Sequence, residues 1–284
     1  MSAEAGSMTW ESAVVWLRNQ PDRRQLVLDA YFDDPLATAA RRYHASDEWR
    51  EITLLLRGRT GKALDVGAGR GIASYALARD GFAVTALEPD PSAIVGSAAI
   101  RALAAETVLP IEVVEEFSER LPFADGAFDV VFARAVLHHT GDLDGACAEM
   151  FRVLRHGGIF IAVREHVISS ERDLKAFLDD HPLHRLYGGE HAFLLDRYLC
   201  ALKHAGFGSI KVLSPLASPI NFSPYTLDTL RDAIVDLASQ KLSGRWFWRR
   251  LLDSNRLFGL LLSVASRFDN RPGRLYSFVA YKNP

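Results

Sequence analysis

Three glycines at alternate positions, Gly67, Gly69 and Gly71, constrain the fold of this chain more than any other feature. They follow a short apolar run that ends at Val66 and precede helical spacing over residues 72–79. Because glycine has no Cβ, its backbone can adopt positive φ and a ligand can approach it closely. A strand, a glycine turn and a helix in this order predict the start of a nucleotide-binding βαβ unit, with the free N–H groups of the helix facing the ligand.

The spacing of these glycines distinguishes between two kinds of nucleotide site. A dinucleotide fingerprint has its third glycine where Ile72 stands, whereas Gly71 comes one residue earlier here. Asp65 precedes the first glycine by two positions. The pattern Asp-x-Gly-x-Gly-x-Gly resembles motif I of the class I S-adenosylmethionine-dependent methyltransferases. The resemblance implies that S-adenosylmethionine is the cofactor and that the motif binds it through Asp65, Gly67, Ala68, Gly69 and Gly71.

An acidic residue follows the next predicted strand. Glu88 lies seventeen residues after Gly71, close to the roughly twenty expected of an acid that binds a ribose. A carboxylate can accept hydrogen bonds from both ribose hydroxyls at once. We therefore assign Glu88 and Pro89 to the cofactor site, and expect Asp90 to cap a helix over residues 92–105.

The stretch 115–123 resembles the adenine-binding segment of the same family, because it ends in Leu-Pro-Phe. The position that usually holds an adenine-binding aspartate is Phe117 here. A phenylalanine can stack on the base but cannot accept a hydrogen bond from its amino group. We expect Phe117, Ser118 and Glu119 to line the adenine pocket, with the Ser118 N–H or a carboxylate of Glu116 or Glu119 making the polar contact.

Polar residues follow two further predicted strands. The run 128–134 favours a buried strand and resembles motif II of the family, and it ends at Arg134. A helix over 142–155, ended by His-Gly-Gly, leads to a fifth strand at 159–163. Ligands bind at the carboxyl ends of the strands in open α/β sheets. We therefore expect Arg134 to contact the cofactor, and the polar residues beyond both strands to reach the site.

Methyl transfer is an in-line displacement, so the enzyme must mainly align the nucleophile, the methyl group and the sulfur. An oxygen nucleophile also needs a base near neutral pH, and histidine is the usual choice. His139 is our first candidate for this base and His166 the second. Further candidates are His138 and His191, with Glu165 and Glu190 as acids that orient an imidazole. No residue is assigned to a metal.

The resemblance implies a doubly wound α/β fold with a seven-stranded, mostly parallel sheet whose last strand is antiparallel. We divide the chain into an N-terminal helical cap (1–60), a Rossmann-like methyltransferase core (61–216 plus 274–284) and a helical insertion or lid (217–273). Within this insertion, residues 241–274 hold eight Lys or Arg against two Asp, beside Trp246, Phe247 and Trp248. Such a segment can contact a membrane surface, or it can be a helical cap that packs on the core.

Composition narrows the classes of partner and compartment. The formal net charge of −2 argues against a whole-chain nucleic-acid binder. The two cysteines, Cys147 and Cys200, lack metal-ligand spacing and fit a reducing cytoplasm, and no signal peptide is visible. We expect a monomer or homodimer.

The resemblance implies methyl transfer to a small-molecule or glycan acceptor. We expect the acceptor atom to be oxygen, and the sequence leaves nitrogen and carbon open. The Tyr-Gly-Gly-Glu-His stretch at 187–191 is similar to bacterial methyltransferases associated with glycan synthesis. Two other functions stay open, namely a non-catalytic S-adenosylmethionine-binding module and an NAD(P)-dependent oxidoreductase.

Overall fold

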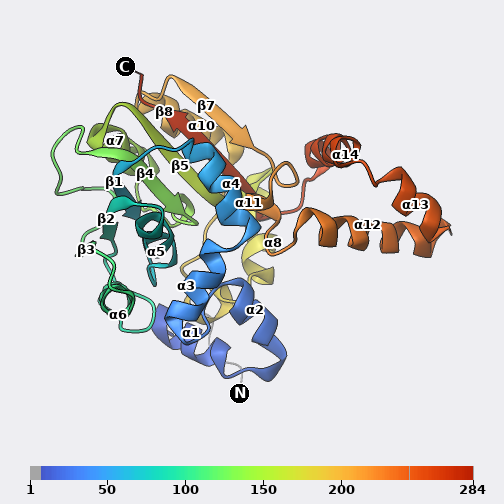
Figure 1. Cartoon of the computed structure of the whole chain (residues 1–284), viewed down its shortest axis with the longest axis horizontal. Helices are drawn as coiled ribbons and strands as arrows, with labels where there is room; N and C mark the ends of the chain where they lie inside the picture. The colour runs from blue at the N-terminus through green and yellow to red at the C-terminus, as the bar shows by residue number, and fades with distance from the viewer. Residues whose placement is uncertain (1–7, 243, 284) are drawn as a thin grey trace.

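A mixed sheet forms the centre of the computed structural model, which describes residues 8–242 and 244–283 (Figure 1). Its strands lie in the order β3-β2-β1-β4-β5-β8-β7, and a two-residue β6 pairs with β5. The strands are β1 (Gly61–Val66), β2 (Phe82–Leu87), β3 (Ile111–Val114), β4 (Phe128–Arg134), β5 (Leu154–Ile168), β6 (Phe193–Leu194), β7 (Ser209–Leu213) and β8 (Arg274–Tyr281).

The topology is that of a doubly wound sheet. Strands β1 to β5 pair in parallel, while β8 is antiparallel to both β5 and β7. The strand order reverses between β1 and β4, which creates a switch point where ligands bind in such folds. The predicted fold class, with its antiparallel last strand, is therefore confirmed.

Helices cover both faces of this sheet. They are α1 (Trp10–Arg18), α2 (Arg24–Asp29), α3 (Leu36–His44), α4 (Asp47–Leu56), α5 (Ile72–Arg79), α6 (Ser97–Thr107), α7 (Leu143–Val153), α8 (Glu171–Asp180), α9 (His184–Tyr187), α10 (Leu195–His204), α11 (Pro219–Phe222), α12 (Leu227–Leu242), α13 (Arg245–Leu251) and α14 (Asn255–Phe268). Short 3₁₀ helices lie at Pro21–Arg23 and Leu137–His139.

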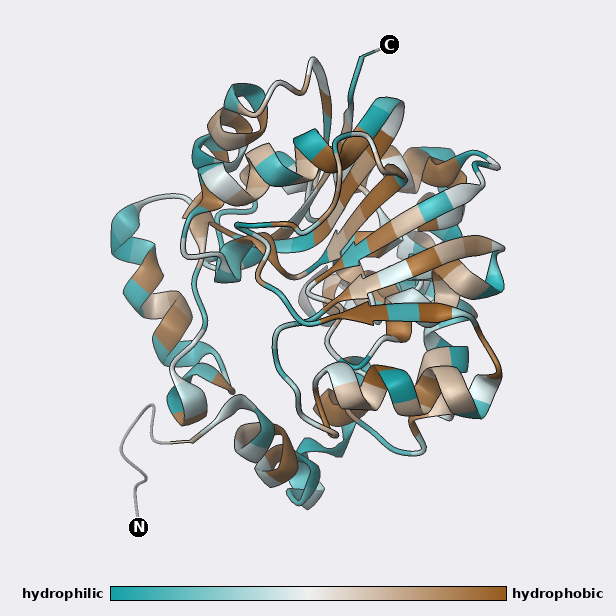
Figure 2. Cartoon of the chain, turned by 90° about the vertical axis from the view of Figure 1, so that its left-hand side faces the viewer, coloured by the Kyte–Doolittle hydropathy of each residue, from teal (hydrophilic) through white to brown (hydrophobic). Residues whose placement is uncertain are grey.

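Alternate residues of the strands supply two separate hydrophobic cores. Val130 and Phe132 of β4 face one core with α3, α4 and α5, whereas Val131 and Ala133 face the other with α7 and α10. Hydrophobic residues accordingly recur along the strands (Figure 2). Such continuous apolar runs are typical of strands that are buried on both faces.

Two local expectations were wrong. The helix predicted over 92–105 begins only at Ser97, because the Asp90 carboxylate instead accepts the N–H of Ser92 in a tight turn. Helix α7 ends at Val153 and β5 begins at once, so the glycines after His156 do not end a helix. They lie in a bulge of β5, where Gly157 has φ of +73° between the residues that pair with Phe128 and Val130 of β4.

The N-terminal helices are attached to the sheet by a buried ion pair. Glu48 of α4 is fully buried, and its carboxylate accepts from Arg134 Nε at 2.7 Å and Nη2 at 3.2 Å. Arg164 Nη1 lies 3.8 Å from the same carboxylate. Burial alone would raise the pKa of Glu48, but Arg134 and Arg164 outweigh it and lower that pKa below its usual value. Two strand ends are thus joined to one helix through a single carboxylate.

Helices α12 to α14 extend from the sheet as an arm (Figure 1). Their own small core contains Val235, Leu252, Phe258 and Leu262. No helix of the residues that the structure describes is long and apolar enough to cross a membrane.

Replacing Glu48 with glutamine removes the charge that balances two buried guanidinium groups. Losing one partner of a buried ion pair costs about 3–5 kcal/mol, so we expect Glu48→Gln to lower the free energy of unfolding in urea by about that much. Asp47→Asn, next to it in α4, is the control. Asp47 pairs with an Arg50 that is two-thirds exposed, so the loss should stay below about 1 kcal/mol. Equal losses in both variants would contradict this role of Glu48.

Candidate active site

A cleft of about 730 Å³ opens at the carboxyl ends of the central strands, at the switch point of the sheet. Its floor contains the glycine turn after β1 and the end of β2. Its walls come from α2, the segment after β4, the end of β5 and residues 181–190. Elements that lie far apart in the sequence therefore enclose a single cleft. Both the glycine turn and the predicted histidines line it.

The glycine turn is built as the sequence predicts. Gly67, Gly69 and Gly71 have φ of +60°, +54° and +81°, values that strain any residue with a Cβ. A Cβ at Gly67 would lie 2.7 Å from Val136. Gly67, Ala68 and Gly69 line the cleft, whereas Gly71 caps α5 and faces Ile100. The third glycine therefore serves helix packing in this structure.

Asp65 lies at the end of β1, on the floor of the cleft. Its carboxylate is 1% exposed and accepts a hydrogen bond from the Ser74 hydroxyl at 2.5 Å. Burial raises the pKa of Asp65 to about 7. A cation bound beside it would favour the ionised form, so this carboxyl group is suited to a positively charged ligand.

Glu88 points to the glycine turn. Its Oε2 accepts the N–H of Gly69 at 2.7 Å, and its Oε1 accepts the N–H of Asp90 at 3.0 Å. Burial raises the pKa of Glu88 above its usual value. Both Glu88 and Pro89 line the cleft. This placement is compatible with the predicted ribose contact, which stays a prediction.

The adenine-binding stretch borders the same cleft through Phe117, Ser118 and Glu119. The Phe117 side chain is 64% exposed, so one face of the ring is open to a stacking partner. Glu119 Oε1 accepts the N–H of Gly141 at 2.9 Å, and its Oε2 accepts from the Ser118 hydroxyl at 3.1 Å. The Glu119 carboxylate therefore helps to fix the segment after β4.

Arg134 borders the cleft, but its guanidinium has protein partners that sequence reasoning missed. It pairs with Glu48 and lies over the rings of Tyr31 and Tyr43, at 5.6 and 5.3 Å from their centroids. Its predicted contact with the cofactor stays a prediction. The sequence signal for a buried Glu48 was its position four residues before Ile52, because residues four apart lie on the same face of a helix.

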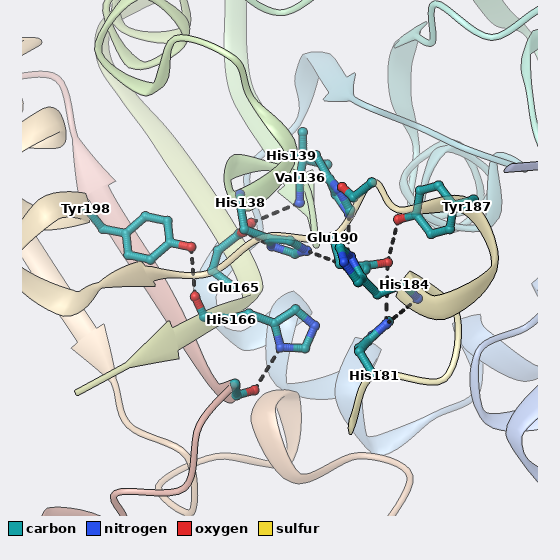
Figure 3. A network of polar contacts seen from close by, with 12 residues as sticks. Val136, His138, His139, Glu165, His166, His181, His184, Tyr187, Glu190 and Tyr198 are labelled. Atoms are coloured by element: carbon teal, nitrogen blue, oxygen red, sulfur yellow. Dashed lines mark hydrogen bonds and ion pairs between the residues drawn. The ribbon is translucent and has the colours of Figure 1, made fainter. Parts of the chain in front are cut away.

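Arg164 and His166, at the end of β5, line the cleft. The pairing of β5 with β8 shifts register between Ala162 and Glu165, where Arg164 has φ of +61°. Glu165 is fully buried and accepts the N–H groups of Val136 and His138, both at 3.1 Å. It also accepts from His138 Nδ1 at 2.6 Å (Figure 3). Burial raises the pKa of Glu165 to about 7.

The predicted histidines His138, His139 and His166 lie close together (Figure 3), and all three line the cleft. The centroid of the His138 ring lies 4.2 Å from that of the His139 ring and 4.7 Å from that of the His166 ring. His166 Nδ1 lies 2.7 Å from the carbonyl oxygen of Gly273. Burial lowers the pKa of His166 to about 3 and that of His138 well below its usual value. Both imidazoles are therefore neutral at physiological pH.

Glu190 completes this cluster. Its Oε2 lies 3.8 Å from His138 Nε2 and 3.7 Å from His139 Nε2, and its Oε1 lies 3.8 Å from His181 Nδ1. The Tyr187 hydroxyl donates to Oε1 at 2.6 Å. Burial would raise the pKa of Glu190, but the neighbouring histidines and Tyr187 outweigh it and lower the pKa.

Sequence reasoning named Glu190 as an orienting acid but missed His181 and Tyr187. The only sequence signal for a role of His181 and Tyr187 in the site was that both lie close to Glu190 in the chain. His191, a sequence candidate, packs its ring against Phe193 at 4.5 Å and does not belong to the cleft lining.

Comparisons with known proteins agree with this geometry. A family model described as a methyltransferase domain matches residues 64–162. A demethylmenaquinone methyltransferase from Beutenbergia cavernae is 28% identical over 78% of this chain and 81% of its own length. A ubiquinone biosynthesis O-methyltransferase from Methylobacterium nodulans is 35% identical, over 35% of this chain and 39% of its own length. Several such matches thus span half or less of the relative.

A solved structure shows the same fold. Phosphoethanolamine N-methyltransferase 2 from Haemonchus contortus, in complex with phosphomonomethylethanolamine and S-adenosylhomocysteine, has a TM-score of 0.56 at 18% identity. The alignment covers 98% of this chain and 61% of that one. The family match shows a methyltransferase domain at residues 64–162, and the solved structure shows that most of the chain shares the fold of a methyltransferase. S-adenosylmethionine is the cofactor of this domain, as the glycine spacing predicts.

Cofactor binding should depend on pH through Asp65. In the free protein this carboxyl group is protonated below pH about 7, whereas the cationic cofactor favours the carboxylate. Binding at lower pH therefore releases a proton, and affinity for S-adenosylmethionine should fall by up to about tenfold per pH unit below 7 and level off above it. Calorimetric titrations at several pH values measure this. Asp65→Asn keeps a partner for Ser74 and should remove the dependence, whereas a variant that retains it would contradict the assignment.

Proposed function

We propose that this protein transfers the methyl group of S-adenosylmethionine to a hydroxyl oxygen of a small, largely apolar acceptor of the phenol or hydroquinone class. The observation that carries the proposal is the histidine cluster of His138, His139 and His166, which borders the cofactor cleft. His139 is the most exposed of the three, and an imidazole is the usual general base near neutral pH. Aromatic and aliphatic side chains of α1 and α2 line the same cleft beside them.

The similar proteins support an acceptor of this kind. Their names include a ubiquinone biosynthesis O-methyltransferase, a demethylmenaquinone methyltransferase and a 2-methyl-6-phytyl-1,4-hydroquinone methyltransferase. Each of these names refers to a quinone or hydroquinone. A glycan acceptor gains no support from them.

The proposed step is a single displacement. The acceptor oxygen attacks the methyl carbon, an O–C bond forms, and the S–C bond breaks with its electron pair passing to sulfur. The hydroxyl proton goes to an imidazole and then to water, so that S-adenosylhomocysteine, the methyl ether and one proton are released. Alignment of oxygen, carbon and sulfur supplies most of the rate enhancement.

The test is turnover with a panel of phenols and hydroquinones and a labelled methyl donor. We expect His139→Ala to lower kcat by roughly 10²–10⁴-fold, the range that a general acid or base contributes. Calorimetric affinity for S-adenosylmethionine should not change, because the polar contacts of the His139 ring are with Gly189 and Glu190 rather than with the glycine turn.

His156→Ala is the matched control, because His156 lies at the opposite end of β5 and contacts the carbonyl of Asn283. Unchanged turnover in His139→Ala would remove this residue from the mechanism. Cofactor binding without methylation of any acceptor in the panel would favour the non-catalytic binding module.

We further propose that the arm of α12–α14 rests on an anionic membrane surface, where an apolar acceptor would be held. Helix α14 buries Phe258 and Leu262 on its inner side. Its outer side exposes a second apolar row at helical spacing, comprising Leu257, Leu260, Leu261, Val264 and Phe268. Trp246 of α13 is 74% exposed, beside the exposed Arg249 and Arg250. Exposed apolar residues flanked by arginines suit the interface of an anionic bilayer.

Sedimentation with lipid vesicles tests this surface. We expect the protein to bind vesicles that contain phosphatidylserine more tightly than vesicles of phosphatidylcholine alone, and binding to weaken with salt. The double variant Trp246→Ser/Phe268→Ser should lose most of the binding. Exposed Val108, at the end of α6, gives the control Val108→Ser. Equal binding by all three proteins would contradict the proposed surface.

A further inference from the structure

We propose that His138 Nε2, His139 Nε2 and Glu190 Oε2 bind one first-row divalent transition-metal ion of the zinc class. The three ligand atoms lie within 4.8 Å of one another and face the acceptor end of the cleft (Figure 3). The sequence predicted no metal site, because two of these ligands are adjacent and the third comes about fifty residues later.

The separations within this triad fit a metal better than hydrogen bonds. Glu190 Oε2 lies 3.8 Å from His138 Nε2 and 3.7 Å from His139 Nε2, both beyond hydrogen-bond distance. Ligand atoms that share a tetrahedral ion at about 2.0–2.1 Å lie roughly 3.4 Å apart. The separation between Glu190 Oε2 and each imidazole nitrogen therefore needs to change by only a few tenths of an ångström.

The outer contacts of the triad strengthen this inference. His139 Nδ1 lies 3.0 Å from the carbonyl oxygen of Gly189. A carbonyl can only accept, so this nitrogen carries the proton and Nε2 presents a lone pair. His138 Nδ1 donates to the buried Glu165 carboxylate, and Tyr187 holds the other oxygen of Glu190. Metal-bound histidines almost always have such a carboxylate or carbonyl partner behind them.

Two more imidazoles lie beside the triad. His166 and His181 form a second group with Glu190, whose ligand atoms also lie within 4.8 Å. The Gly273 carbonyl accepts from His166 Nδ1, which leaves its Nε2 without a proton. His166 Nε2 is thus available as an additional ligand. The 37% exposure of the His139 side chain leaves one side of the triad open to a substrate.

The ligand chemistry selects the class of ion. Imidazole nitrogen suits zinc, iron, cobalt, nickel and copper, whereas magnesium and calcium prefer oxygen. Two histidines and one carboxylate with an open position are typical of catalytic sites rather than closed structural ones. We therefore expect zinc, iron(II) or cobalt to bind, and magnesium to bind weakly.

The role of this ion rests on the proposed function. An acceptor hydroxyl that occupies the open position would lose its proton more readily, as a zinc-bound water does. With its Nε2 on the ion, His139 would not itself take the proton, which would pass to solvent water. The oxygen would attack the methyl carbon, and the electron pair of the broken bond would stay on sulfur.

Binding of Co²⁺ and Zn²⁺ to the full-length, chelator-treated protein tests the site without any acceptor. We expect calorimetry to give one ion per chain, and Co²⁺ to give visible absorbance typical of a low-coordinate site. Glu190→Gln and His138→Gln should weaken binding more than 100-fold. Tyr187→Phe removes an outer contact only and should weaken it by about 10–100-fold.

His191→Gln is the matched control, because His191 neighbours Glu190 in the chain but its ring packs on Phe193 outside the triad. It should bind Co²⁺ as the unsubstituted protein does. Absence of binding in the unsubstituted protein would overturn the proposal, and so would equal affinity in Glu190→Gln or an equal loss in His191→Gln.

Turnover measurements separate this proposal from the proposed function. Metal binding by the triad without methylation of any phenol supports the site and contradicts the function. Methylation that survives chelation, in a protein that binds no Co²⁺, supports the function and overturns the metal site.

Discussion

The acceptor half of the site depends on one buried carboxylate, that of Glu165. It is completely buried at the end of β5, and it binds two backbone N–H groups and one imidazole of the segment after β4. Burying a carboxylate is costly unless hydrogen bonds compensate for the lost water. These three donors therefore fix the backbone that carries His138 and His139. The shift in register at Arg164 places Glu165 within reach of these donors. The arrangement of the histidine cluster therefore depends on the geometry of β5.

A second buried carboxylate, that of Glu48, fixes neighbouring elements on the other face of the sheet. Glu48 joins α4 to the ends of β4 and β5 through Arg134 and Arg164. Because those same strand ends carry the histidine segment and Glu165, the N-terminal helices are tied to the elements that shape the acceptor pocket. Tyr31, which lies over Arg134, borders the cleft as well. The N-terminal helices thus take part in building the site rather than only covering it.

Much of the fold could be predicted because local patterns determine it. The strand at 128–134 has the predicted bounds, since short apolar runs between turn residues define buried strands. The full length of β5 could not be predicted, because its second half pairs with β8 more than one hundred residues later. The same limit applies to the site. The glycine turn is continuous in sequence, whereas the Glu48–Arg134 pair spans 86 positions. The histidine cluster and Glu190 likewise come from the 3₁₀ helix Leu137–His139, the end of β5 and the segment 181–190.

The two halves of the cleft differ in charge, and this difference bears on the chemistry. Asp65 and Glu88 stand beside the glycine turn, where a cationic cofactor would stabilise their ionised forms. The acceptor half instead contains imidazoles that burial keeps neutral, together with the ionised Glu190. An acceptor anion would be repelled by Glu190 and gain little from neutral rings, so histidines alone can take a proton but stabilise the resulting oxygen poorly. A divalent cation held by Glu190 and two imidazoles would reverse this balance and give the developing anion an opposite charge to bind.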